Sequence, residues 1–136
     1  MRELRGRRSG VSERRTAVSD VMMDADMRAC IDACRACERV CRETIPYCRS
    51  KGGMHAEADH LRLMQDCVEI CQTSASFMER LSPLHRFVCG ACAEVCERCH
   101  EDCLRMGDDP RMAACAEACR RCAESCRHMS GHMMAA

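Results

Sequence analysis

Sulfur-bearing residues, mainly cysteine, recur along most of the chain at alternating steps of three and four residues. The stretch from Cys89 to Cys103 shows it most simply, with cysteine at 89, 92, 96, 99 and 103 and mainly alanine, glutamate and arginine between them. Because an α-helix turns about 100° per residue, positions with this spacing share one narrow face. Such a face, which we call the seam, normally carries leucine or isoleucine and becomes the inside of a helix bundle.

The same spacing predicts four helices, beginning at about Ser19 and separated by breaks at 52–53, 82–83 and 107–110. Glycine can close the helix before a break, and Ser82 or Asp109 can cap the next helix with proline at its first position. Links this short force antiparallel neighbours, so we predict an all-α, antiparallel up-down-up-down four-helix bundle. Pro46 lacks an N–H and is expected to kink or end the first helix.

The seam holds almost only sulfur. Its 28 positions comprise sixteen cysteines, eight methionines, two histidines and two hydroxyl residues. The cysteines are Cys30, Cys34, Cys37, Cys41, Cys48, Cys67, Cys71, Cys89, Cys92, Cys96, Cys99, Cys103, Cys115, Cys119, Cys122 and Cys126. The others are Met23, Met27, Met64, Met78, Met106, Met112, Met129, Met133, His60, His85, Thr44 and Ser74. Leu, Ile, Val and Phe number only eighteen of 136 residues, too few for an ordinary core, so either sulfur or a bound species must supply the interior.

Charge and composition restrict the partners and the location. The 21 basic and 21 acidic residues balance, which gives no charge-driven case for nucleic acid, and no apolar run is long enough to span a membrane. We expect residues 1–18 to be a disordered basic tail, 19–130 the bundle domain and 131–136 a flexible tail. The paired arginines of the tail precede no apolar stretch of the kind that export signals need, so a cytoplasmic location is expected. Without a paired acid and base, no enzymatic activity is predicted.

Three explanations for the cysteines do not involve a stored metal. A lone seam cysteine is usually a small buried hydrophobe, but that cannot account for sixteen. A disulfide-stapled helical protein is less favoured because Cα–Cβ bonds at i and i+4 run parallel and make poor disulfide partners. An iron–sulfur or thiol redox protein is also less favoured, since these spacings lie in helices rich in alanine, glutamate and arginine rather than in Gly- and Pro-punctuated loops.

Charge favours a monovalent soft metal ion. Each tetrahedral zinc site of four thiolates keeps two negative charges, so four such sites would place about eight charges in the core. Cu(I) prefers thiolate and thioether ligands, and two of them are enough. If each thiolate bridges two ions, the core holds about one Cu(I) per cysteine and is neutral. The sequence therefore predicts storage of many Cu(I) ions, and a zinc or general soft-metal thiolate sponge remains the alternative.

The repeated Cys-x3-Cys and Cys-x2-Cys steps on all four predicted helices, over about residues 20–130, resemble the four-helix-bundle copper storage proteins. The likeness is closer to the cytosolic branch of that family than to its exported branch. It implies a bundle that is folded before metal arrives, fills with many Cu(I) ions and assembles as a homotetramer. It also implies that copper is admitted through one end lined by methionine or histidine.

The bundle topology sorts the remaining soft ligands into two ends. One end is predicted to gather Met23, Met27, Met78, His85, Met129 and Met133, and the opposite end His60, Met64, Met106 and Met112. Thioethers bind Cu(I) without charge or deprotonation, so a ring of them can pass an ion to the thiols. We predict that copper is admitted at the Met23/Met27 end, which also matches the methionine run of the exported family members. His55, His100 and His128 lie off the seam and are expected to be solvated.

Overall fold

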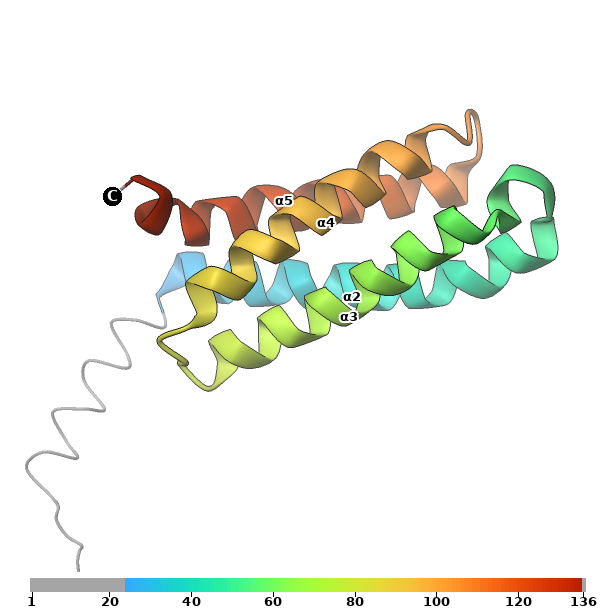
Figure 1. The fold of residues 1–136 in the computed structure, drawn as a ribbon. Helices are drawn as coiled ribbons and strands as arrows, with labels where there is room; N and C mark the ends of the chain where they lie inside the picture. Colours follow the sequence, from blue (N-terminus) through green and yellow to red (C-terminus); the bar gives the residue numbers. More distant parts are fainter. Residues whose placement is uncertain (1–23, 136) are drawn as a thin grey trace, which may run out of the picture.

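The computed structural model describes the backbone of residues 24–135 and the side chains of residues 24–131, and Figure 1 shows the resulting fold. Its helices are α2 (Ala25–Lys51), the short 3-10 helix η1 (Gly53–Ala56), α3 (Ala58–Glu79), α4 (His85–Leu104) and α5 (Pro110–Ala135). The predicted basic tail and the ligand candidate Met23 lie outside the described residues, as does the side chain of Met133.

The four long helices form a ring around a single core. Helix α2 packs on α3, α3 on α4, α4 on α5, and α5 on α2. In Figure 1, α3 lies in front of α2 and α4 in front of α5, and short links join consecutive helices at alternate ends. This confirms the predicted antiparallel up-down-up-down four-helix bundle. Within the described residues, no helix is both long and apolar enough to cross a membrane.

Most of the predicted helix ends are where the sequence indicated them. The start of α2 differs from the predicted start at about Ser19: the described helix begins at Ala25, and the Asp24 carboxylate accepts a 3.0 Å hydrogen bond from the Met27 N–H. Gly52 closes α2 with φ +76°, a conformation that glycine adopts without strain. At the start of α5, Asp109 Oδ1 accepts from the N–H groups of Arg111 (2.9 Å) and Met112 (3.3 Å), and Pro110 is the first helical residue, as predicted.

Two local predictions were wrong. Ser82 Oγ accepts a 3.1 Å hydrogen bond from the Leu84 N–H, but Pro83 and Leu84 form a turn and are not the first residues of a helix. The Ser82 N–H donates to Phe77 O (2.9 Å) in a left-handed closure of α3 centred on Leu81, with φ +57°. Helix α4 consequently starts only at His85. Pro46 does not end the first helix, since α2 continues through it to Lys51, and the alternative that it kinks the helix stays a prediction.

Candidate metal centre

The interior of the bundle is made of thiols. All sixteen cysteines are at most 1% exposed and all are free. They come from all four long helices, because the alternating three- and four-residue steps keep each cysteine on the inward face of its helix. Every other described seam position is also buried, apart from Met106 and Met129, which are partly buried. The seam prediction is confirmed.

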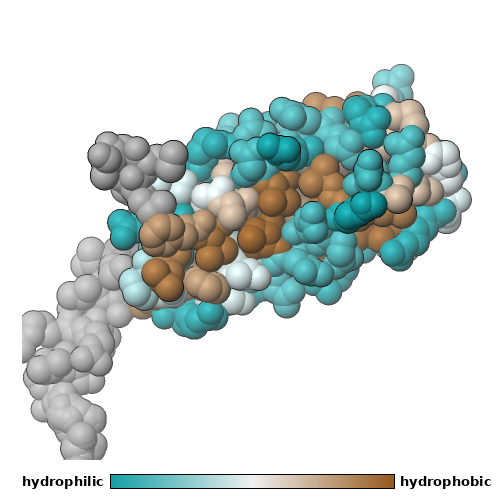
Figure 2. All heavy atoms as spheres, in the orientation of Figure 1, coloured by the Kyte–Doolittle hydropathy of each residue, from teal (hydrophilic) through white to brown (hydrophobic). Residues whose placement is uncertain are grey.

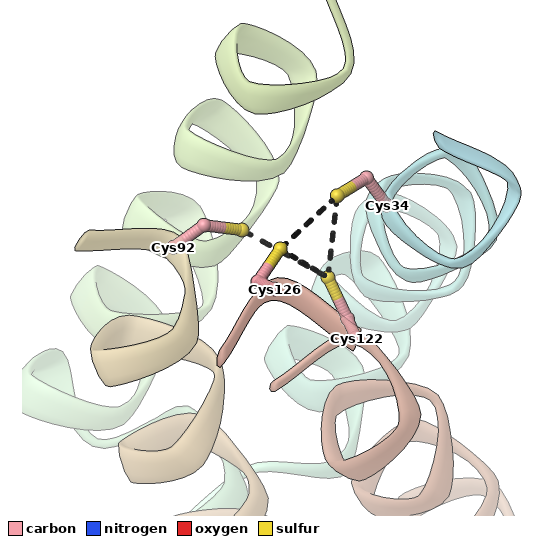
Figure 3. Close-up of side chains that lie close together, drawn as sticks. All are labelled: Cys34, Cys92, Cys122 and Cys126. Carbon is pink, nitrogen blue, oxygen red and sulfur yellow. Dashed lines mark hydrogen bonds between the residues drawn. The ribbon is translucent and has the colours of Figure 1, made fainter. Parts of the chain in front are cut away.

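The sulfurs gather into compact groups. Three groups of four thiols and one group of three have all their Sγ atoms within 4.8 Å of one another. Figure 3 shows one of them, in which Cys34 from α2, Cys92 from α4 and Cys122 and Cys126 from α5 point toward a common centre. The others are Cys37/Cys71/Cys96/Cys122, Cys37/Cys41/Cys67/Cys119 and Cys30/Cys89/Cys126. No backbone group separates the thiols within a group, so a soft ion placed there would find thiol ligands from several helices.

The groups join into one continuous row because they share Cys126, Cys122 and Cys37. Successive Sγ atoms lie 3.5 to 3.9 Å apart in the order Cys30, Cys126, Cys34, Cys122, Cys71, Cys96, Cys67, Cys37, Cys119, Cys41, Cys115, Cys103. The row therefore runs along most of the bundle. It crosses repeatedly between helices, so the two cysteines of α3 are enough to keep it continuous.

The two hydroxyl residues of the seam lie in the same interior but behave differently. Ser74 Oγ contacts Cys89 Sγ at 3.4 Å and Cys126 Sγ at 3.9 Å, so it lies among the sulfurs. Thr44 Oγ1 instead donates a 2.6 Å hydrogen bond to Val40 O, one turn back in α2. Thr44 is thus satisfied by its own helix, and Ser74 is the hydroxyl that takes part in the sulfur row.

At one end of the row, which we call the Cys30 end, soft side chains surround a cavity. The cavity has a volume of about 430 Å³ and is lined by Asp24, Asp26, Met27, Pro83, His85, Arg86, His128 and Met129. The group Cys30/Cys89/Cys126 belongs to the same end. His85 Nδ1 lies 2.9 Å from Ser82 O. Because a carbonyl can only accept, Nδ1 carries the proton of a neutral ring, and Nε2 keeps a lone pair for a ligand.

At the other end, which we call the Cys48 end, the donors are already in contact. Cys48 Sγ lies 3.6 Å from Met112 Sδ, 3.9 Å from Met64 Sδ and 3.5 Å from His60 Nε2. The other ring nitrogen of His60 is 2.5 Å from the Asp102 carboxylate. None of the four donor residues is more than 1% exposed. The predicted end residues His60, Met64 and Met112 are therefore together, whereas Met106 is only partly buried.

Burial raises the pKa of thiols near both ends of the core. Desolvation is the main reason that the pKa of Cys48 rises to about 11. The contact with Cys126 lowers the pKa of Cys89, but the contact with Cys30 and burial outweigh it and bring the value to about 11. Among the described residues no lysine or arginine is buried, so no cation is available to balance a bare thiolate. A bound cation must supply that charge, and it displaces protons when it binds.

Sequence reasoning missed several polar partners around the Cys48 end. His55 and His100 are half-buried rather than solvated: His55 Nε2 is 2.8 Å from Asp109 Oδ2, and His100 Nδ1 is 2.9 Å from Ala116 O. Tyr47 also donates to Asp109, at 2.7 Å. None of these pairs has a fixed spacing along the chain, so only the fold reveals them. His128 is exposed, as predicted.

Comparison with known proteins gives consistent matches. A family model described as copper storage protein matches residues 23–131. The crystal structure of the Nmul_A1745 protein from Nitrosospira multiformis is 46% identical with a TM-score of 0.74, covering 79% of this chain and 96% of that one. The Cu(I)-bound copper storage protein 3 of Bacillus subtilis is 34% identical with a TM-score of 0.72, covering 77% and 98%. A cytosolic copper storage protein from Streptomyces lividans, in a structure with five coppers, is 30% identical with a TM-score of 0.72, covering 78% and 92%.

Proposed function

Because the chain belongs to the copper storage protein family, we propose that it stores Cu(I) ions on the thiolates of its core, at about one ion per cysteine. The observation that carries this proposal is a core of sixteen buried free thiols, twelve of them in one continuous row, without a buried lysine or arginine beside them in the described part of the chain. Two-coordinate Cu(I) with bridging thiolates fills such a row and leaves it neutral. The solved relatives that carry copper support the same ion.

Zinc is the second candidate, and distance alone does not separate the two metals. A tetrahedral site with Zn–S bonds of about 2.3 Å places its sulfurs roughly 3.8 Å apart, close to the contacts in this row. Charge does separate them, because each zinc with four thiolates keeps two negative charges in a core without buried cations. The sharing of Cys37, Cys122 and Cys126 between groups also prevents all of them from acting as independent four-thiolate sites.

The remaining parts of the proposal concern setting and access. The protein acts by binding and release, without catalytic turnover. It does so in the cytoplasm, a location that the cytosolic copper storage protein of Streptomyces lividans supports. It associates as a homotetramer, as the resemblance implies. Copper is admitted at the Cys30 end, where the cavity brings solvent close to Met27, His85 and Met129.

A competitive titration tests the storage proposal. The reduced, metal-free protein is titrated anaerobically with Cu(I) in the presence of a chromophoric chelator, and the titration is repeated with Zn(II). We expect the Cu(I) endpoint near the sixteen cysteines. An endpoint of only a few equivalents, or a higher capacity for Zn(II) than for Cu(I), contradicts the proposal.

A further inference from the structure

One face of the bundle carries a band of apolar side chains along the junction of α3 and α4 (Figure 2). We call it the α3/α4 band, and its residues are Leu63, Ile70, Phe77, Leu84, Phe87, Val88, Ala91 and Val95. Leu84 is 55% exposed and Phe87 57% exposed. The chain has only two phenylalanines, and both belong to the band. Contiguous apolar surface of this kind on a water-soluble fold marks a contact with another molecule.

The band has a protruding part and a hollow part. The large side chains of Phe77, Leu84 and Phe87 stand where α3 and α4 are joined. Farther along, a groove of about 350 Å³ is lined by Asp66, Glu69, Ile70, Thr73 and Val95. The small residues Thr73 and Ala91 lie between the two parts and permit a close approach of backbones. If a two-fold axis passes near the small residues, the large side chains of each copy face the groove of the other copy. A two-fold contact needs this self-complementary shape.

The positions along α3 fit that symmetry. Phe77 and Ile70 are seven residues apart, about 10 Å along the helix, and Thr73 lies near their midpoint. A two-fold axis near Thr73 therefore places Phe77 of each copy over the groove beside Ile70 of the other. We propose that the α3/α4 band is the contact between two copies of this chain, packed antiparallel about this axis. The proposal deepens the self-association proposed above and rests on it.

Charge is complementary about the same axis. Arg80 lies seven residues after Thr73, with its guanidinium 4.7 Å from the centre of the Phe77 ring, and Asp66 lies seven residues before Thr73. Within the described residues, neither Arg80 nor Asp66 has an ion-pair partner in its own copy. The axis brings Arg80 of one copy beside Asp66 of the other, and the reverse, so both charges gain a partner.

The opposite face of the bundle is a weaker candidate for this contact. Its groove, between α2 and α5, is larger at about 760 Å³, but mainly alanines line it. Its charged rim residues Glu117 and Arg121 already pair at 3.0 Å within one copy. By contrast, α3 and α4 have 22 and 20 residues and present a face roughly 30 Å by 20 Å, comparable with the roughly 800 Å² per partner of a standard interface.

Sedimentation of the full chain tests the surface. The reduced, metal-free protein is compared over a range of concentrations with Phe87→Glu and with Leu104→Glu, a control that is equally exposed on α4 but outside the band. We expect the wild type to associate, Phe87→Glu to weaken association by roughly thirtyfold or more, as loss of an aromatic anchor does, and Leu104→Glu to leave it unchanged. Circular dichroism of each variant verifies folding.

A charge swap provides the second measurement. Arg80→Glu alone and Asp66→Arg alone are each expected to weaken association, and the double variant to restore most of it. A wild type that stays monomeric overturns both the self-association and the band. Association that persists in Phe87→Glu and in Arg80→Glu overturns only the position of the contact. Cu(I) capacity, measured on the same samples, should stay near sixteen, and a low capacity in the wild type counts against storage instead.

Discussion

The two ends of the bundle carry the same kinds of donor but expose them differently. At the Cys30 end, a cavity of about 430 Å³ reaches Met27, His85 and Met129. At the Cys48 end, Cys48, His60, Met64 and Met112 are at most 1% exposed and already in mutual contact. Thiol, thioether and imidazole occur at both ends, so ligand chemistry alone does not distinguish them. The cavity beside the donors of the Cys30 end and the mutual contacts of the donors at the Cys48 end distinguish them.

We propose on the basis of this difference that the two ends play different parts in loading. An incoming ion is hydrated or held by a carrier and must exchange those ligands one at a time, which requires donors that solvent can reach. At the Cys30 end, the partly buried Met129 borders the cavity together with Met27 and His85, which are 2% and 7% exposed. At the Cys48 end, the contact between His60 and Asp102 orients the imidazole toward Cys48. We expect that end to hold an ion rather than to collect one.

The sharpest test of this difference removes one thiol at each end. Cys126 belongs to two thiol groups at the Cys30 end, whereas Cys48 contacts only thioethers and an imidazole. Cys126→Ser should lower the Cu(I) capacity by about two ions, because a bridging thiolate serves two, and should slow uptake. Cys48→Ser should lower the capacity by at most about one ion and leave the uptake rate unchanged. Stopped-flow uptake and endpoint titration measure both, and equal slowing by the two variants would contradict the assignment.

A smaller effect is expected from the thioethers. Met27→Leu with Met129→Leu should slow uptake and chelator-driven removal several-fold while the capacity stays unchanged, because leucine keeps the apolar volume but cannot bind Cu(I). The matched control is Met64→Leu with Met112→Leu at the Cys48 end. Slowing by the control pair alone would place the access at the Cys48 end, and no slowing by either pair would mean that these methionines only fill space.

The helix caps at the two ends should also contribute differently to the free energy of unfolding. Asp24→Ala removes a single capping bond at the Cys30 end and should cost about 1 kcal/mol. Asp109→Ala at the Cys48 end should cost more, because Asp109 also accepts from Tyr47 and contacts His55. The Tyr47 hydrogen bond is the main cause that lowers the pKa of Asp109 to about 2.

The pH dependence follows from the direction of that shift. A carboxylate with a depressed pKa stabilises the fold above its unfolded value of about 4, and the contribution is lost as the pH falls toward about 2. Urea unfolding at pH 7 and near pH 2 should therefore show the Asp109→Ala penalty at pH 7 and its near disappearance in acid. A penalty equal to that of Asp24→Ala at both pH values would show that the contacts with Tyr47 and His55 add nothing.

The smallest effect that we expect is the change in helical content when Cu(I) binds. The helices have capped ends and ion pairs at i,i+4, such as Arg98 with Glu94 at 2.7 Å, and do not depend on metal for their hydrogen bonds. Far-UV circular dichroism of the reduced, metal-free protein should therefore be helical and change little on Cu(I) loading. A coil spectrum that becomes helical with copper would show that the ends form only around the metal.

The sequence predicted the seam because a helix has a fixed period. Every cysteine that the three- and four-residue steps placed on one face is buried, and Gly52 and Asp109 end or begin their helices as the local chemistry of glycine and aspartate indicates. Ser82 shows the limit of such rules. Its Oγ accepts from the Leu84 N–H as a cap would, yet α4 begins only at His85, because the link that closes α3 also occupies Pro83 and Leu84 with a turn.

What the sequence by itself determined is therefore the set of inward positions, the order of the helices and the soft chemistry of the core, because each follows from local geometry and residue type. Only the tertiary structure decided which sulfurs meet. Cys30 and Cys126 are 96 residues apart in the chain yet 3.6 Å apart at Sγ, and His60 finds Asp102 across 42 residues. The same holds for the cavity at the Cys30 end and the α3/α4 band, since both depend on how neighbouring helices are rotated and shifted against each other. Helical period sets which side of a helix faces inward, and packing between helices sets what it meets there.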